Sequence, residues 1–165
     1  GTPNLAQEVV HTVLAGGQGY CQHESLLRSG ETTQTLLQAA QRLVMEHQAS
    51  IPFRHDVVHF DFQPFNLLTD GQRLSGVVDW DGPRIGDGAF DWATLLFYGY
   101  ENKIAHSIVW GHALQWASIQ VLSTYLAHLF VRQVDWSLRH HHESVAQIYI
   151  RRSVAILNDI ATRLQ

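Results

Sequence analysis

The chain has 165 residues, which is enough for one domain with a single buried core and short for two. Hydrophobic residues make up 45% and charged residues 16% of the sequence, a balance typical of folded globular proteins and not of disordered ones. The formal net charge of -4 offers no broad positive field to a nucleic-acid backbone, so we expect no nucleic-acid partner. Cys21 is the only cysteine, which excludes an intrachain disulfide and favours a reducing, cytoplasmic setting.

The first fifty residues predict two helices. Thr2-Pro3 is a start signal for a helix whose apolar side chains recur at helical spacing until Gly16. A loop is expected to follow. A second helix with one apolar stripe is predicted from about Thr33, and it ends before Pro52 because the residue preceding a proline avoids the helical conformation.

The helical pattern stops at residues 57–60, a short run that begins with two β-branched valines and predicts a strand. A loop from Asp61 to Asn66 follows. Residues 67–69 and 74–79 flank the turn 70–73 and together predict a β-hairpin. Two acidic residues, Asp61 and Asp79, therefore lie at strand ends.

The second half of the sequence predicts helices. A helix that begins at Asp87-Gly88 is apolar nearly all round, so we expect it inside the core. A helical region is predicted over 104–130, then a polar link over 132–143, then a last helix over about 145–164. Residues 104–131 contain no Asp, Glu, Lys or Arg, but the histidines and glutamines spread through them favour a core helix, broken at Gly111, over a membrane span. The fold class is α+β, mostly α.

The segment from His59 to Asn66 carries the pattern H-x-D-x-x-x-x-N of a kinase catalytic loop. An acid at Asp61 can orient an attacking hydroxyl and accept its proton, and an amide oxygen five residues on can reach a magnesium ion. A second acid belongs with them, because Mg²⁺ on ATP phosphates is held by one or two protein oxygens and by water. Asp79 fits, since the predicted hairpin returns it to the neighbourhood of Asn66.

These residues, together with Gly76-Val77-Val78-Asp79-Trp80 and Gly86-Asp87-x-x-x-Asp91, resemble the aminoglycoside phosphotransferase and choline kinase superfamily. The resemblance implies the fold of a protein-kinase-like C-terminal lobe, with helices around a small β-hairpin and the catalytic loop. It implies that Asp61 is the catalytic acid or base, that Asn66 and Asp79 are Mg²⁺ ligands, and that His59 organises the loop. It also implies that Asp87 and Asp91 brace the loop, and that Phe60 replaces a glycine common in the family.

A kinase also holds ATP, ordinarily with a loop over the phosphates and a strand lysine in a small lobe that precedes the catalytic lobe. Lys103 is the only lysine and follows Asp79, so it cannot be that residue. We therefore expect residues 1–165 to be a single domain, the catalytic lobe without its small lobe. The predicted function is transfer of the ATP γ-phosphate to a hydroxyl of an antibiotic or metabolite, with Mg²⁺ as cofactor and with this chain inactive alone.

Two other functions stay open from the sequence. The first is a non-catalytic binding or assembly module that keeps the fold and has lost the small lobe. Loss of that lobe should expose apolar surface near the first helix and the hairpin, so we expect the chain to form a homodimer or to associate with the missing N-terminal lobe. The second is a metal-dependent hydrolase, since His55, His59 and Asp61 are residue types that ligate transition metals.

Overall fold

The computed structural model describes residues 4–17 and 21–165 of the chain. In chain order the elements are α1 (Leu5–Ala15), α2 (His23–Ser29), α3 (Glu31–His47), the 3₁₀ turn η1 (Gln48–Ser50), β1 (Asp56–Val58), the 3₁₀ turn η2 (Pro64–Asn66), β2 (Leu67–Thr69), β3 (Leu74–Val77), β4 (Arg84–Gly86), α4 (Ala89–Tyr98), α5 (Lys103–Trp116), α6 (Ile119–His140) and α7 (Glu143–Arg163). The expected class, mostly helical with small antiparallel strand pairs, is confirmed.

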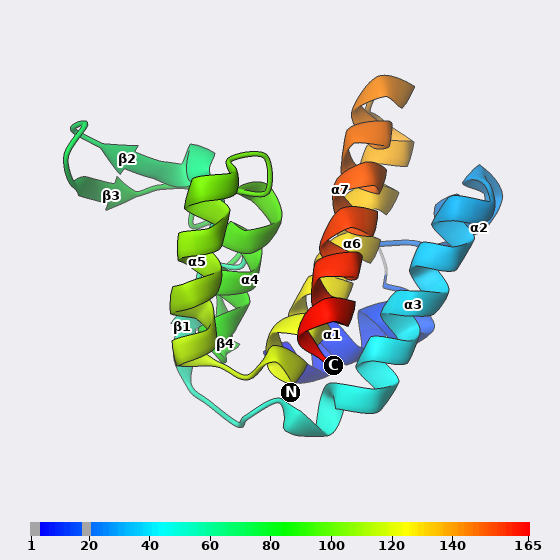
Figure 1. The fold of residues 1–165 in the computed structure, drawn as a ribbon, viewed down its shortest axis with the longest axis horizontal. Helices are drawn as coiled ribbons and strands as arrows, with labels where there is room; N and C mark the ends of the chain where they lie inside the picture. Colours follow the sequence, from blue (N-terminus) through cyan, green and yellow to red (C-terminus); the bar gives the residue numbers. More distant parts are fainter. Residues whose placement is uncertain (1–3, 18–20) are drawn as a thin grey trace.

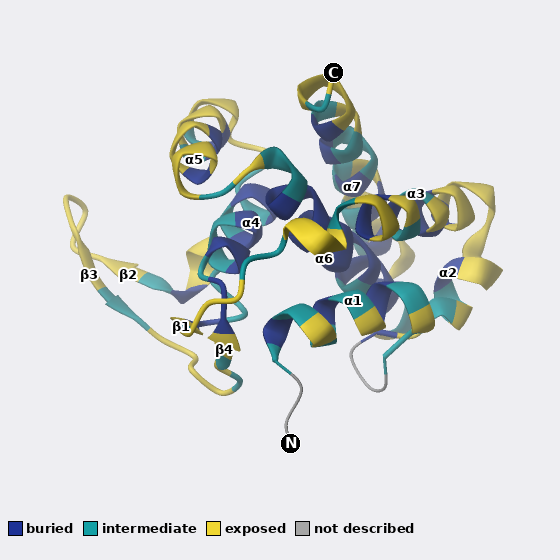
Figure 2. Cartoon of the chain, turned by 90° about the horizontal axis from the view of Figure 1, so that it is seen from below, coloured by how far each residue is buried: buried dark blue, intermediate teal, exposed yellow. Residues whose placement is uncertain are grey.

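Helix α6 is the centre of the fold. It packs against α1, α2, α3, α4 and α7, and Figure 2 shows it dark blue between α4 on one side and α3 and α7 on the other. Its side chains are buried nearly all round, as expected for a helix surrounded by others. Tyr125, Leu129 and Phe130 of α6 have no exposed surface and meet Phe90 and Phe97 of α4 in one hydrophobic cluster.

Helix α1 begins at a cap that the sequence analysis did not identify. The Asn4 side chain accepts a hydrogen bond from the Gln7 amide (2.9 Å), and the Gln7 side chain accepts one from the Asn4 amide (3.2 Å). This reciprocal pair satisfies two amide groups that a helix start leaves without partners. The predicted start signal, Thr2-Pro3, lies outside the described residues.

The predicted loop before the second helix contains a further helix, α2. It has only seven residues and Leu26 is its only buried side chain, so its apolar period is too short to stand out in the sequence. The Thr33 hydroxyl donates to the Leu26 carbonyl (2.6 Å) and to the Gly30 carbonyl (2.9 Å). These bonds fix the corner between α2 and α3, which starts at Glu31, two residues before the predicted start.

The predicted hairpin is confirmed as the antiparallel pair of β2 and β3, which projects away from the helices in Figure 1. A second pair was not predicted: β1 lies antiparallel to β4, with Val57 opposite Ile85. The pair brings Gly86 against α1, where a Cβ built on Gly86 would lie 2.5 Å from the Leu5 Cβ. Only glycine permits this close approach of β4 to α1.

The prediction for residues 104–143 was wrong in two places. The helix runs unbroken through Gly111 and ends at Trp116, and the break falls at Ala117-Ser118, where the Ser118 hydroxyl accepts a hydrogen bond from the Val121 amide (3.3 Å) and caps α6. The region 132–140, predicted as a link, continues α6, and two of its charged residues, Asp135 and Arg139, pair one turn apart within the helix. Among the described residues, no helix combines the length and apolarity that a membrane span requires.

Candidate active site

The predicted catalytic loop joins β1 to β2, and the His59 ring fixes its start. The Asp61 amide donates to Nδ1 of His59 (3.3 Å), and on the other side of the ring Nε2 lies 2.8 Å from the Val78 carbonyl oxygen. Because Nδ1 accepts, Nε2 must carry the proton in the neutral ring and donate it to Val78. The imidazole therefore ties the loop to the residue before Asp79.

Asp91, in the first turn of α4, holds the same part of the loop from inside the core. Its carboxylate accepts hydrogen bonds from the His59 amide (2.8 Å) and from the Phe60 amide (3.1 Å). Burial raises the pKa of Asp91, and the two amide donors and the nearby His59 oppose the rise. The expectation that Asp91 braces the loop agrees with these contacts.

Asp87 has other partners than the loop. Its carboxylate accepts from the Ala89 amide (3.2 Å) and from the Tyr125 hydroxyl (3.1 Å), and Arg54 lies 3.5 Å away. Burial raises the pKa of Asp87 in spite of these partners. Asp87 thus joins the start of α4 to α6 and to Arg54 ahead of β1, and none of these contacts is with the catalytic loop.

Asp61 and Asn66 contact each other directly. The Asn66 side-chain nitrogen donates to the Asp61 carbonyl oxygen (2.9 Å) and to its carboxylate (3.2 Å), and the Gln63 side chain donates to the same carboxylate oxygen (2.8 Å). Asn66 is buried. With its nitrogen committed to Asp61, the amide oxygen is the atom of Asn66 that can ligate a cation.

The hairpin brings Asp79 to the loop, as its spacing predicted. Leu67 pairs with Val77, and the Val78 amide donates to the Asn66 carbonyl oxygen (3.0 Å), so Asp79 follows directly on a residue bonded to Asn66. Asp79 has a φ of 65°, in the left-handed region that aspartate tolerates better than most residues. Its side chain and that of Asp61 line one cleft of about 320 Å³, called here the catalytic cleft.

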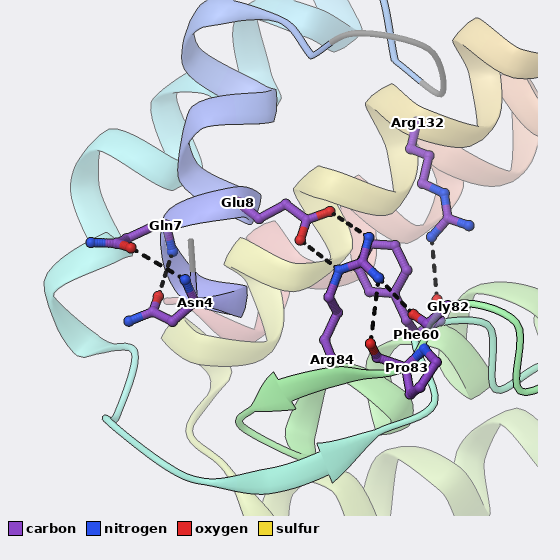
Figure 3. Close-up of polar contacts among 8 residues, drawn as sticks. All are labelled: Asn4, Gln7, Glu8, Phe60, Gly82, Pro83, Arg84 and Arg132. Carbon is purple, nitrogen blue, oxygen red and sulfur yellow. Dashed lines mark hydrogen bonds and ion pairs between the residues drawn. The ribbon is translucent and has the colours of Figure 1, made fainter. Parts of the chain in front are cut away.

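The far wall of the catalytic cleft is an ion pair that the sequence analysis missed. Arg84 of β4 binds Glu8 of α1 through two hydrogen bonds (2.7 and 3.1 Å), and a further nitrogen of Arg84 donates to the Gly82 carbonyl (2.8 Å) (Figure 3). Glu8 and Arg84 are 76 positions apart, so no local pattern pairs them. The contact fastens α1 to the segment that follows Asp79.

Phe60 shows why glycine is common at its position in the related family. Its φ is 71°, a left-handed conformation that is strained for a bulky side chain. Several contacts hold it there: the ring stacks on Phe90 (4.9 Å between centroids), and the guanidinium groups of Arg84 and Arg132 each lie 4.6 Å from the ring centroid. Arg132 also donates to the Phe60 carbonyl oxygen (3.2 Å), as Figure 3 shows.

His128 of α6 lies behind Phe60 and is buried. Burial lowers its pKa to about 3, and the positive charges of Arg132 and Arg84 act in the same direction. Its Nδ1 has no hydrogen-bond partner among the described residues. His128 is therefore a neutral residue of the core at ordinary pH.

Two further residues with reactive side chains lie at the catalytic cleft. Asp81 lines the catalytic cleft, and so does Cys21, whose pKa burial raises to about 12, so its thiol stays protonated at neutral pH. Within residues 4–17 and 21–165, no group of three or more His, Cys, Asp or Glu side chains is arranged to hold a metal ion. That result weakens the transition-metal reading, whereas Mg²⁺ needs only one or two protein oxygens in addition to phosphate and water.

Comparisons with known proteins match the same region. A family model described as a phosphotransferase enzyme family matches residues 18–119. A hygromycin-B 4-O-kinase from Escherichia coli is 29% identical over 76 residues, which cover 46% of this chain and 22% of that enzyme. A crystal structure of a thermostable mutant of the aminoglycoside phosphotransferase APH(4)-Ia, in a ternary complex with AMP-PNP and hygromycin B, superposes with a TM-score of 0.71 at 19% identity.

That superposition covers 90% of this chain and 50% of the other. The chain therefore spans about half the length of the solved relative, and its match to the curated kinase covers 22% of that enzyme. The likeness places the whole helical arrangement in the same fold. The family model covers the catalytic loop, the hairpin, Asp79 and α4, that is, the two acids that line the catalytic cleft and the elements that position them. The chain belongs to this phosphotransferase enzyme family.

Proposed function

We propose that the chain is the catalytic lobe of a small-molecule kinase that transfers the γ-phosphate of ATP to a hydroxyl group of an antibiotic or metabolite. The observation that carries the proposal is that Asp61 and Asp79 line one cleft and that Asn66, beside it, is bonded to Asp61 and to the residue before Asp79. An Asp, an Asn and a second Asp in this order are the residues with which protein kinases position the attacking hydroxyl and hold Mg²⁺.

In this proposal Asp61 orients the acceptor hydroxyl and takes its proton. The acceptor oxygen forms a bond to the γ-phosphorus while the bond from that phosphorus to the bridging oxygen breaks, and ADP leaves with the electron pair. Asn66 and Asp79 would hold Mg²⁺, which when bound neutralises charge on the phosphates. His59 is a positioning residue, because its contacts are to the loop and to Val78.

The donor side of the proposal needs more than the described residues supply. The strands of the described chain form only two two-stranded pairs, and Lys103 lies on α5 with its ammonium 3.3 Å from the Tyr100 ring centroid, so it does not serve ATP. We therefore propose that this chain alone binds nucleotide weakly and transfers phosphate slowly, and that a small ATP-binding lobe completes the enzyme.

Exposed apolar side chains mark a surface for that lobe. Phe65 is 89% exposed, and Leu68, Leu74 and Trp80 on and beside the hairpin are exposed as well. Apolar patches of this kind are typical of interaction surfaces. Their position next to Asn66 and Asp79 favours the ATP-binding lobe as the partner, with self-association as the competing outcome. Light scattering at high protein concentration separates the two, since a monomeric mass contradicts self-association.

The test of the function compares Asp61→Asn with Asp70→Asn, a matched change in the exposed turn of the hairpin. Binding of AMP-PNP is measured by calorimetry with and without Mg²⁺, on this chain and on a version extended by an N-terminal ATP-binding lobe. We expect Mg²⁺-dependent binding and ADP production from the extended version, with Asp61→Asn lowering the rate about 100-fold or more. Equal rates for the two variants, or no nucleotide binding by either version, would contradict the proposal.

A further inference from the structure

A second cleft borders the catalytic one. Its volume is about 230 Å³, and Asp61 and Arg132 line both clefts. Three residues of α6 follow one another at one-turn spacing: His128, Arg132 and Trp136. His128 lines the catalytic cleft, Arg132 lines both clefts, and Trp136 lines the second cleft. The second cleft is therefore a continuation of the first, one helical turn closer to the C-terminal end of α6. We call it the aromatic cleft.

Three half-buried aromatic side chains, Tyr98, Trp136 and Tyr149, give the aromatic cleft its character. Tyr149 stacks parallel to Phe97 in the core (6.0 Å between centroids, 7° between planes), and Tyr98 meets Tyr149 edge to face (6.4 Å). Trp136 contacts the His140 ring (4.0 Å between centroids). These contacts hold the rings in place, so a ligand that packs against them does not have to order them first.

The charges around the aromatic cleft disfavour a cationic ligand. Asp61 is the only carboxylate among its described lining residues, which also include Arg132. The aromatic faces that often bind ammonium groups already lie near guanidinium groups: Arg152 is 5.1 Å from the Tyr149 ring centroid, and Arg139 is 5.8 Å from that of Trp136. Each of these two guanidinium groups is ion-paired, Arg139 with Asp135 and Arg152 with Glu101, and the charge of Asp61 is matched by Arg132, so the lining has no surplus negative charge to offer a polycation.

Uncharged polar groups complete the cleft. The Gln133 amide lines it and can both donate and accept hydrogen bonds. Burial, followed by the negative charge of Asp61, raises the pKa of Tyr98, so its hydroxyl stays neutral and can also play both parts. Such groups suit the hydroxyls of a ring compound whose apolar face packs on an aromatic side chain.

The positions of the acids assign a direction to the reaction. Asp79, the proposed Mg²⁺ ligand, lines the catalytic cleft and not the aromatic cleft, whereas Asp61 lines both. Attacking and leaving oxygens lie roughly in line across the transferred phosphorus. When the donor is held near Asp79, the acceptor therefore belongs on the other side of Asp61, in the aromatic cleft.

We infer that the aromatic cleft is the acceptor site and that the acceptor is an uncharged, hydroxylated ring compound, not a polycation such as an aminoglycoside. The claim that this ligand accepts a phosphate rests on the proposed function. The inference goes further in naming the chemical class of the substrate and the residues that select it, Trp136 and Tyr149 as the aromatic lining and Arg132 by balancing the charge of Asp61.

The test is a binding measurement on this chain without nucleotide, so that it does not depend on phosphate transfer. The probes are methyl β-D-glucopyranoside as the uncharged ring, kanamycin as the polycation and choline as a single cation, each titrated by ligand-detected NMR. Trp136→Leu removes the ring but keeps apolar bulk, and Trp116→Leu, at an exposed tryptophan outside both clefts, is the matched control. Circular dichroism verifies that both variants fold.

We expect the glucoside to bind more tightly than kanamycin or choline, and Trp136→Leu to weaken it roughly three- to tenfold while Trp116→Leu leaves it unchanged. Tighter binding of either cation, no binding of the glucoside, or equal effects of the two variants would overturn the inference. If Trp136→Leu does not fold, Tyr149→Leu takes its place with the same expectation. Glucoside binding without phosphotransfer by the lobe-extended protein would refute the proposed function and leave the binding site intact.

Discussion

The buried His128 predicts that the protein loses stability as the pH falls. In the folded protein the pKa of His128 is lowered to about 3, by burial first and then by Arg132 and Arg84. In the unfolded chain the imidazole titrates near its ordinary value of about 6.5. A depressed folded-state pKa contributes stability above the unfolded value, and that contribution is lost as the pH falls from about 6.5 towards 3.

The size of the effect follows from linkage. Between about pH 7 and pH 5 the unfolded chain takes up a proton at His128 and the folded protein does not, so the free energy of unfolding decreases by about 2 kcal/mol from this residue alone. The figure depends little on the folded-state value, because any pKa well below 5 leaves the folded imidazole neutral. Against a typical stability of about 5–15 kcal/mol, it is large enough to measure.

Urea unfolding of the protein and of His128→Leu, at about pH 7 and pH 5, measures this contribution. Leucine is apolar and similar in size, so the variant should lose about 2 kcal/mol less than the parent on acidification. The variant should also be at least as stable at pH 7, because the unpartnered Nδ1 is removed. His11→Leu, at an exposed histidine of α1, is the control. The same pH dependence in parent and His128→Leu would refute the reasoning.

Three further predictions concern other contacts. Asp91→Ala leaves two loop amides without their acceptor and should destabilise the protein by about 3 kcal/mol, measured by urea unfolding; a loss below about 1 kcal/mol would contradict the bracing role. Gly86→Ala forces a Cβ against Leu5 and should lower stability by roughly 1–3 kcal/mol, whereas Gly111→Ala, in open space on α5, should raise it by about 1 kcal/mol; thermal melts that rank them otherwise argue against the close approach. The Cys21 thiol should react with a disulfide reagent at about pH 8 at least 100-fold more slowly in the native protein than in urea, and fast native labelling would show that it is accessible.

The parts of the fold that the sequence predicts are those with local signals. The hairpin follows from the turn between two short runs, α4 follows from a segment that is apolar nearly all round, and α7 follows from its apolar period. The parts it misses depend on distant partners: β4 is only three residues long and exists because β1 lies beside it. The polar stretch after Arg132 remains helical because Asp135, buried in α6, pairs with Arg139 one turn later.

The candidate site also contains some residues that local sequence signals predict and others that depend on distant partners. Asp61, Asn66 and Asp79 are close in sequence and are joined by a hairpin, so their meeting could be foreseen from spacing alone. Arg132 lies on α6, 71 residues after Asp61 in the sequence, and no motif predicts that it lines the catalytic cleft. The aromatic cleft was beyond sequence reasoning for the same reason, since its rings come from α4, α6 and α7.

The two hydrogen bonds that the loop amides donate to Asp91 have a consequence for how the protein unfolds on heating. The amides of His59 and Phe60 are held by a carboxylate rooted in α4, and α4 packs on the central helix α6, so the start of the loop depends on the packing of these two helices. The site should therefore not loosen ahead of the core, and the amide protons of His59 and Phe60 should exchange with solvent only when α4 leaves α6. Substrate binding and the fold should then fail together, over one narrow range of temperature.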